Sequence, residues 1–273
     1  MRAARLLLLL SCLPLAAAAQ DFDEQRLPLW EAGLTGRLSS GPAYPGSDTR
    51  AMRVLALPFV YYRGKVFHAD ESGAGARLVR SDAWELDLGF AGALPPRGNG
   101  VPAREGMPNL GTLVEFGPRA RITLARPTAT SQLRLDLPLR TVIEARGGLR
   151  GRGWTFEPKL ALELHETPER WGMDVHGSVL VGDAQVNHFF YDVAPQYVTP
   201  TRPAYQAKAG LMTTRLGVGV THRLGADLRL HGSLNYDSYV GSANLGSPLN
   251  KSNGGVSIGI GLAWTLARSG VKQ

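Results

Sequence analysis

The sequence of 273 residues contains one cysteine, Cys12, which lies near the N-terminus. The rest of the chain can therefore form no intramolecular disulfide, which excludes a small secreted scaffold held together by cystines. Long hydrophobic runs are also lacking beyond the N-terminal segment. The longest, from Val54 to Tyr62, is interrupted by Pro58, whereas a membrane-spanning helix needs about 20 apolar residues. A bundle of transmembrane helices is therefore excluded.

Positive charge is not concentrated anywhere in the chain. The formal net charge is +7, and removal of Arg2 and Arg5 with an N-terminal leader would lower it to +5. Proteins that bind nucleic acids carry blocks or stripes of lysine and arginine. Here the excess is small and spread along the sequence, so we expect no nucleic-acid partner.

The N-terminus has the pattern of a secretory signal peptide. Its first five residues include the basic Arg2 and Arg5, residues 6–15 are mostly apolar, and a run of alanines ending at Ala19 supplies a small-residue cleavage site. A lipoprotein signal cleaved before Cys12 is disfavoured, because Leu10 stands where a small residue is usual. We therefore expect residues 1–19 to be a signal peptide and residues 20–273 to form a single exported domain.

Two stretches near the C-terminus alternate between apolar and polar residues with a period of two. From Ala226 to Tyr236 the even positions are small or apolar and the odd positions are mostly polar. From Val256 to Leu266 large apolar residues alternate with serine, glycine, alanine and threonine. This period is typical of β-strands with two different faces. A soluble sandwich and a membrane barrel both produce it, so alternation alone does not decide between them.

Similar segments recur along the whole chain, with no convincing helix between them. They include a first strand at 30–38 and a short aromatic strand at 185–192. Between the strands lie predicted connections, among them a turn at 147–153. Strand length, the lack of a helix or disulfide, and the small face of the last strand favour a membrane barrel. Because bacterial barrels usually have an even number of strands, we predict an all-β, transmembrane antiparallel β-barrel of about 12 strands, within a range of 10 to 14.

The connections between the predicted strands differ in length. Gly225 forms a minimal turn, whereas residues 240–254 form a long polar loop. Bacterial outer-membrane barrels have short periplasmic turns and longer extracellular loops. We therefore expect Gly225 to face the periplasm and the 240–254 loop to face the exterior.

One arrangement of residues is compatible with an enzyme. His176-Gly177-Ser178 and His231-Gly232-Ser233 each place a histidine and a serine on one face of a strand, where a base could activate a hydroxyl. Asp174 and Asp227 share those faces. Neither set is distinguished as a complete site with an oriented histidine and an oxyanion hole. We interpret both as polar residues lining a wet lumen, and we predict no catalytic residues.

The sequence indicates neither a metal site nor a cofactor site. No glycine-rich phosphate-binding motif opens a helix, so the glycines are better explained by packing and turns. The six histidines are dispersed without ligand spacing, at His68, His165, His176, His188, His222 and His231.

A set of charged residues should face the barrel interior together. In a narrow barrel such residues pair and fill the interior, whereas in a wide one they line a channel. We favour pairing. The set comprises Arg134, Asp136, Arg140, Glu144, Lys159, Glu163, Asp174, Asp227 and Arg229.

Several short motifs follow one another along almost the whole mature chain. They are Tyr44-Pro45-Gly46-Ser47-Asp48, Leu57 to Gly64, Arg104 to Gly111, Glu115-Phe116-Gly117-Pro118, Tyr191-Asp192-Val193, Tyr205 to Gly210, and Gly246-Ser247-Pro248-Leu249. In order and spacing they resemble the MipA/OmpV family of MltA-interacting outer-membrane proteins. The resemblance implies an outer-membrane β-barrel without catalytic residues. For the founding type it implies a scaffold that joins a murein-degrading lytic transglycosylase to a murein-synthesising penicillin-binding protein; other relatives are linked to adhesion, osmotic adaptation and antibiotic uptake.

The C-terminus departs from the usual pattern, in which the closing strand ends the chain on an aromatic residue. Here Trp264 and Leu266 are followed by residues 267–273. We predict a scaffold embedded in outer-membrane lipid, with a small-solute pore as the alternative and a barrel-borne lipid hydrolase as the third possibility. Because periplasmic turns offer little surface, the leader 20–29 and the tail 267–273 are the expected extra contacts with partners.

Overall fold

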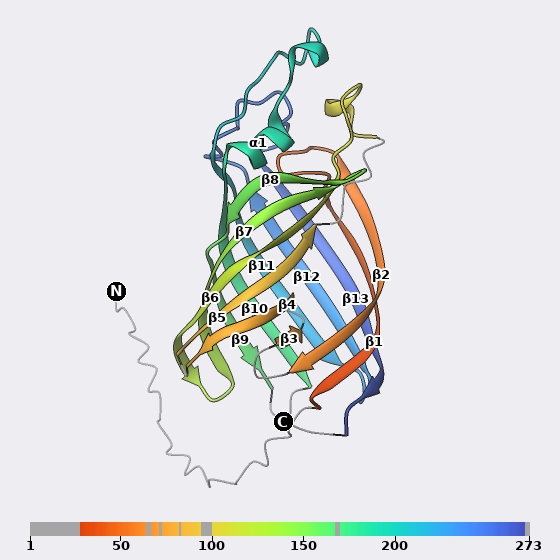
Figure 1. Cartoon of the computed structure of the whole chain (residues 1–273), viewed down its shortest axis with the longest axis vertical. Helices are drawn as coiled ribbons and strands as arrows, with labels where there is room; N and C mark the ends of the chain where they lie inside the picture. Colours follow the sequence, from red (N-terminus) through yellow and green to blue (C-terminus); the bar gives the residue numbers. More distant parts are fainter. Residues whose placement is uncertain are drawn as a thin grey trace, which may run out of the picture.

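In the computed structural model the chain forms a closed antiparallel β-barrel, seen from the side in Figure 1. The structure describes residues 28–63, 67–70, 73–81, 83–93, 100–166 and 170–270, so the expected signal peptide lies outside the described residues. The strands within these ranges are β1 (Trp30–Pro42), β2 (Arg50–Arg63), β3 (Phe67–Asp70), β4 (Gly73–Arg80), β5 (Trp84–Ala93), β6 (Thr112–Thr128), β7 (Ser131–Ala145), β8 (Leu149–Phe156), β9 (Lys159–His165), β10 (Trp171–Gly182), β11 (Gly210–Arg223), β12 (Leu228–Ser238) and β13 (Gly254–Arg268).

The thirteen strands occupy twelve positions around the barrel, because β8 and β9 lie end to end and share one position. Both pair with β7 on one side and with β10 on the other. Pro158 stands between them, and a proline has no N–H to continue the ladder of hydrogen bonds. Pairing of β10 with β11 and of β1 with β13 closes the ring. The predicted antiparallel barrel of about 12 strands is therefore confirmed.

The outer face of the barrel is apolar and the inner face is polar or small. On β13 the six large apolar side chains from Val256 to Leu266 are 43% to 57% exposed, whereas Ala263 and Thr265, on the other face, are buried. A soluble sandwich would bury such large residues in its core. Their outward position identifies a barrel that crosses a membrane, where lipid covers this surface. No helix in the described ranges is long and apolar enough to cross a membrane.

Short turns and long loops lie at opposite ends of the barrel. Residues 129–130 join β6 to β7 and residues 224–227 join β11 to β12, at the end where β1 begins and β13 ends. The long segments 183–209 and 239–253 lie at the other end (Figure 1). The predicted turn at Gly225 and the predicted loop 240–254 are thus separated by the height of the barrel. We call these ends the terminal end and the loop end.

The prediction of a strand at 185–192 was wrong, because this segment is the helix α1 (Ala184–Tyr191). Asp183 caps its first turn by accepting a hydrogen bond from the backbone N–H of Val186 at 2.9 Å. Its buried residues are Val186, Asn187 and Tyr191, and Asn187 and Tyr191, four residues apart, lie on the same face of the helix. The short apolar run had no alternation to distinguish strand from helix.

The prediction of a turn over 147–153 was also wrong, since β8 begins at Leu149 and only residues 146–148 turn. Glycines at 151 and 153 interrupt the alternation of β8 and conceal it in the sequence. Gly153 has a φ of +90°, and a Cβ there would collide with the carboxylate of Asp183. Glycine is required at this position because the start of α1 lies directly against it.

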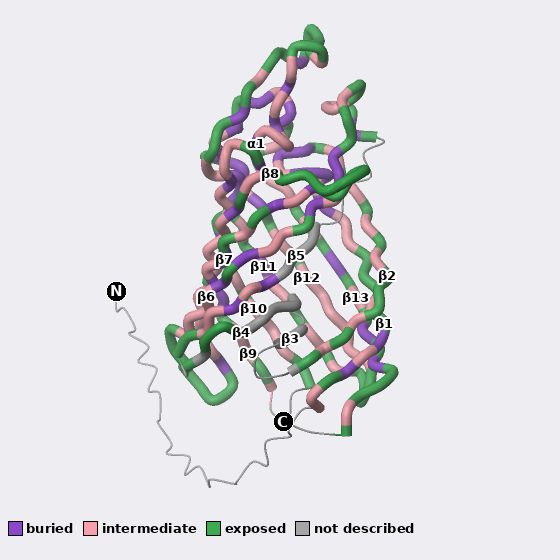
Figure 2. The backbone as a smooth tube through the Cα atoms, in the orientation of Figure 1, coloured by how far each residue is buried: buried purple, intermediate pink, exposed green. Residues whose placement is uncertain are grey.

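The packed core of the protein lies at the loop end, as the concentration of buried segments in Figure 2 shows. Tyr44, Val193 and Leu249 form one buried cluster, and Tyr191 and Met212 belong to a second. Fully burying a large apolar side chain contributes about 1.5–3 kcal/mol. We call the region formed by 43–49, 100–111, 183–209 and 239–253 the cap.

Three tyrosines in the cap should resist ionisation. Burial raises the pKa of Tyr44 and of Tyr239 to about 12, and raises the pKa of Tyr191 as well. An unfolded tyrosine has a pKa near 10, so the stabilisation is complete below pH 10 and is lost as the pH rises from 10 to 12. Each two-unit shift corresponds to about 3 kcal/mol.

A spectrophotometric titration of the eight tyrosines at 295 nm checks this expectation. Three of them should ionise only together with the loss of the near-ultraviolet circular dichroism signal of the cap. Complete ionisation by pH 10.5 with that signal intact would contradict it.

Candidate functional site: the lumen and its cap

Charged side chains line the lumen and pair across neighbouring strands. Asp87 on β5 lies opposite Arg119 on β6, whose Nε and Nη2 donate to the carboxylate at 3.1 and 2.9 Å. Arg134 Nη1 lies 2.6 Å from Glu163 Oε1. Such pairs satisfy charges that the lipid-facing side of a barrel would not accept. Further pairs are Arg121–Glu85, Arg134–Asp136, Lys159–Asp136, Arg140–Glu115, Arg152–Glu144, Arg215–Asp237 and Arg229–Glu31.

The predicted charged lining is correct except at Asp227. The other eight residues lie on inward-facing positions of β7, β9, β10 and β12, and each has an oppositely charged or histidine partner. Asp227 belongs to the exposed turn before β12, where it pairs with Arg268. Asp227 has an odd residue number, like the lumen-facing Arg229, and was therefore predicted to face the lumen. However, β12 begins one residue later, at Leu228.

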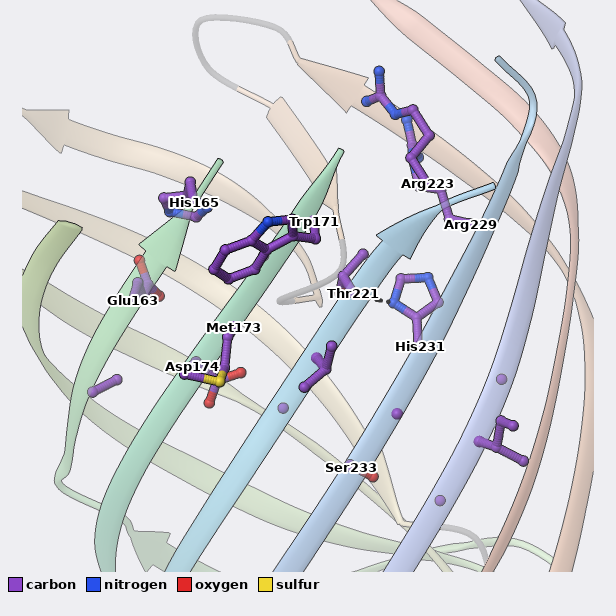
Figure 3. A pocket seen from close by; sticks show the side chains of 18 of the residues that line it. Glu163, His165, Trp171, Met173, Asp174, Thr221, Arg223, Arg229, His231 and Ser233 are labelled. Atoms are coloured by element: carbon purple, nitrogen blue, oxygen red, sulfur yellow. Dashed lines mark hydrogen bonds between the residues drawn. The ribbon is translucent and has the colours of Figure 1, made fainter. Parts of the chain in front are cut away.

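Two cavities lined by described residues lie inside the barrel. The lower cavity, toward the terminal end, has a volume of about 830 Å³, and Figure 3 shows part of its lining, with Arg223 and Arg229 on adjacent strands. The upper cavity, beneath the cap, has a volume of about 590 Å³. Arg37 and Ser233 line both, and Arg37 Nη2 donates to Ser233 Oγ at 3.0 Å. The boundary between the two cavities therefore lies at Arg37.

The first predicted histidine–serine set faces the lumen, but its two members bond to different partners. His176 Nδ1 lies 2.6 Å from Asp174 Oδ2, whereas Ser178 Oγ donates to Glu157 Oε1 at 3.0 Å. The histidine is therefore oriented by an acid, as the sequence suggested, while the serine hydroxyl is engaged with a different carboxylate.

In the second predicted set the members are also engaged elsewhere. His231 Nδ1 lies 3.2 Å from Thr221 Oγ1, a contact drawn in Figure 3, while Ser233 accepts the hydrogen bond from Arg37. Among the described residues, no group of three or more histidine, cysteine or acidic side chains is placed to hold a metal ion.

Five of the seven motifs that are scattered along the sequence meet in the cap, whereas those that begin at Leu57 and Glu115 lie on β2 and β6. Tyr44 Oη donates to the carbonyl of Leu249 at 2.7 Å, and Ser247 Oγ donates to the carbonyl of Tyr191 at 2.8 Å. The carbonyl of Gly46 accepts from the N–H of Lys251 at 2.7 Å. Gly46 has a φ of +84°, which favours glycine. These bonds join three loops that are far apart in the sequence.

Two buried asparagines and two arginines complete these connections. Asn244 Nδ2 donates to Asn187 Oδ1 at 2.8 Å, and both side chains are 0% exposed. Arg104 donates to the carbonyl of Phe190 at 2.9 Å. Arg202 donates to the carbonyls of Ala103, Glu105 and Tyr197 at 2.9 to 3.1 Å. Sequence alternation could not reveal these residues, because they lie in loops or on α1 and not on strands.

Several solved structures resemble this barrel at low sequence identity. The NanC porin has a TM-score of 0.44 and 11% identity, covering 85% of this chain and 100% of its own. A bacterial polysaccharide outer membrane secretin has a TM-score of 0.42 and 9% identity, covering 87% of this chain and 99% of its own. Outer membrane phospholipase A from Escherichia coli has a TM-score of 0.35 and 10% identity, covering 85% and 92%. Likenesses at this level carry no conclusion about function.

The comparison by sequence is more informative. No curated protein matches the chain. A family profile described as "MltA-interacting protein MipA" matches residues 34–266, which include most of β1, all of β2 to β12, most of β13 and the whole cap. The chain therefore belongs to the MipA family.

Proposed function

We propose that this chain is a non-enzymatic barrel of the outer membrane that serves as a scaffold for a lytic transglycosylase and a penicillin-binding protein of the cell envelope. The family description names an interaction with MltA, a lytic transglycosylase. The observation that carries the proposal is the packed cap over a lumen lined by ion pairs, because this construction suits a fixed support better than an open channel.

The terminal end is the docking face in this proposal, with the cap directed to the exterior. Its turns are short, but the β6–β7 hairpin adds surface (Figure 1). Trp84, the first residue of β5, pairs with Ile122, so residues 124–128 extend past that strand. Residues 124–130 are all exposed. β1 begins and β13 ends at the same end, and the leader 20–27 and the tail 271–273 lie outside the described residues.

Binding of a purified lytic transglycosylase to immobilised full-length protein tests the scaffold. Deleting 20–27 and 271–273, combined with Ala129→Trp at the hairpin tip, should weaken binding at least tenfold, because these changes remove or block the docking face. Val198→Asp, at an exposed position of the cap, is the matched control and should bind as the unaltered protein does. Loss of binding in the cap variant alone would contradict the proposed docking face.

A small-solute pore is the second candidate, and the two lumen cavities favour it. In planar bilayers, the unaltered protein should show no sustained conductance steps if the cap closes the loop end. Asn244→Ala removes the buried amide that bonds to Asn187 and to the backbone of Lys208, and should produce intermittent conductance by loosening the cap. Steady conductance by the unaltered protein would support the pore and contradict a closed scaffold.

The non-enzymatic assignment is tested with the two lumen serines. The double variant Ser178→Ala, Ser233→Ala should release fatty acids from phospholipid vesicles at the same background rate as the unaltered protein, because neither hydroxyl is bonded to its neighbouring histidine. Loss of one buried hydrogen bond at Ser178 should lower stability by about 1 kcal/mol. A serine-dependent rate above background would overturn the assignment in favour of a hydrolase.

A further inference from the structure

The upper cavity differs from the usual interior of a transmembrane barrel because much of its lining is apolar. Lumens of such barrels are normally polar. Here strands from several sides and α1 supply hydrophobic side chains to the same space, and its volume of about 590 Å³ is within the range of small-molecule sites, about 300–1,000 Å³. The apolar residues include Leu55, Leu113, Leu180, Phe189, Phe190 and Met212.

Most charged groups in this lining are already satisfied. Arg215 pairs with Asp237 at 2.6 Å, and Glu115 pairs with Arg140 at 3.5 Å. Arg53 donates to the backbone carbonyls of Pro42 and Ala43. These groups neutralise one another or bond to the backbone, so they do not need a charged ligand as a partner.

Arg37 is the exception. Its guanidinium donates to Ser233 Oγ, and in the described part of the chain no carboxylate pairs with it. Gly259 lies beneath it, where a Cβ would come within 2.9 Å of Nη2, so glycine allows the guanidinium to lie against the barrel wall. Arg37 therefore presents one positive charge at the boundary between the upper and lower cavities.

Among the described residues, most of β2 beside the upper cavity pairs with a strand on one side only. Residues 50–62 of β2 pair with β1, whereas on the other edge only Tyr62 and Arg63 pair with β3. The stretch without a described second neighbour carries Leu55, which lines the cavity. Non-hydrogen-bonded backbone at membrane depth is tolerated where it borders a cavity or is covered. The upper cavity therefore borders an edge of β2 that no described strand covers.

We propose that the upper cavity binds an amphipathic monocarboxylate, such as a medium-chain fatty acid. Its carboxylate accepts hydrogen bonds from Arg37, and its apolar chain lies among Leu55, Leu113 and the phenylalanines of α1. One unpaired cation next to an apolar space matches a ligand with one acidic group and a hydrocarbon body. This site is independent of the scaffold function, because it lies inside the barrel and away from the terminal end.

Calorimetric titration of the full barrel, held in amphipol without detergent, tests the site with three probes. Decanoate should bind saturably at one site, whereas decanol, which lacks the acid, and acetate, which lacks the chain, should bind at least tenfold more weakly. Arg37→Gln should weaken decanoate binding by about ten- to a hundredfold and leave decanol unaffected, as expected for the loss of a charge-assisted hydrogen bond. Leu55→Trp should abolish binding by filling the cavity.

Arg50→Gln is the matched control, because Arg50 does not line the cavity and its guanidinium is bonded to Ser40 Oγ and to the carbonyl of Val256. It should bind decanoate as the unaltered protein does, and the heat-dependent gel mobility of each variant reports whether its barrel is folded. Equal affinities for decanoate and decanol, no saturable binding, or an unchanged affinity in a folded Arg37→Gln variant would each overturn the proposal.

Discussion

Closure of the backbone hydrogen-bond ladder is the constraint on which the rest of this structure depends. A lipid environment offers no partner for an exposed N–H or carbonyl group, so the edges of a sheet that crosses it must be joined, or must border a cavity as the described part of β2 does. Pairing of β1 with β13, from Glu31 opposite Arg268 to Ser40 opposite Ile258, joins the first strand to the last. Once the ring is closed, each residue of a strand faces either lipid or lumen. The period-two alternation then places apolar side chains toward lipid and polar or small side chains toward the lumen.

This separation concentrates charge inside the barrel. Burying a charged group without a partner costs several kcal/mol, so the lumen arginines require carboxylates from neighbouring strands. The register supplies them, as where Asp87 lies directly opposite Arg119. Arg37 lacks such a partner among the described residues, and this is why the boundary between the cavities stands out chemically from the rest of the lining.

The cap is built on a different principle from the wall. Its residues are held by side-chain bonds to backbone carbonyls and by the small cores around Tyr44 and Tyr191. Loop backbone that is buried must find hydrogen-bond partners, and here asparagine, serine and arginine side chains provide them. Five of the seven family motifs lie in these loops, so segments far apart in the sequence contribute to a single assembly.

The sequence by itself determined the alternating strands, their approximate number, the small inner face of β13 and the opposite placement of the Gly225 turn and the 240–254 loop. These follow from a local rule, since side chains point alternately to two faces and turns attract particular residues. Tertiary structure decided the helix at 184–191, the glycine-rich strand β8, the exclusion of Asp227 from the lumen and the meeting of Asn187 with Asn244. Each of these features depends either on a contact between residues distant in sequence or on the residue at which a strand begins. Local periodicity reveals neither the distant contact nor the exact start of a strand.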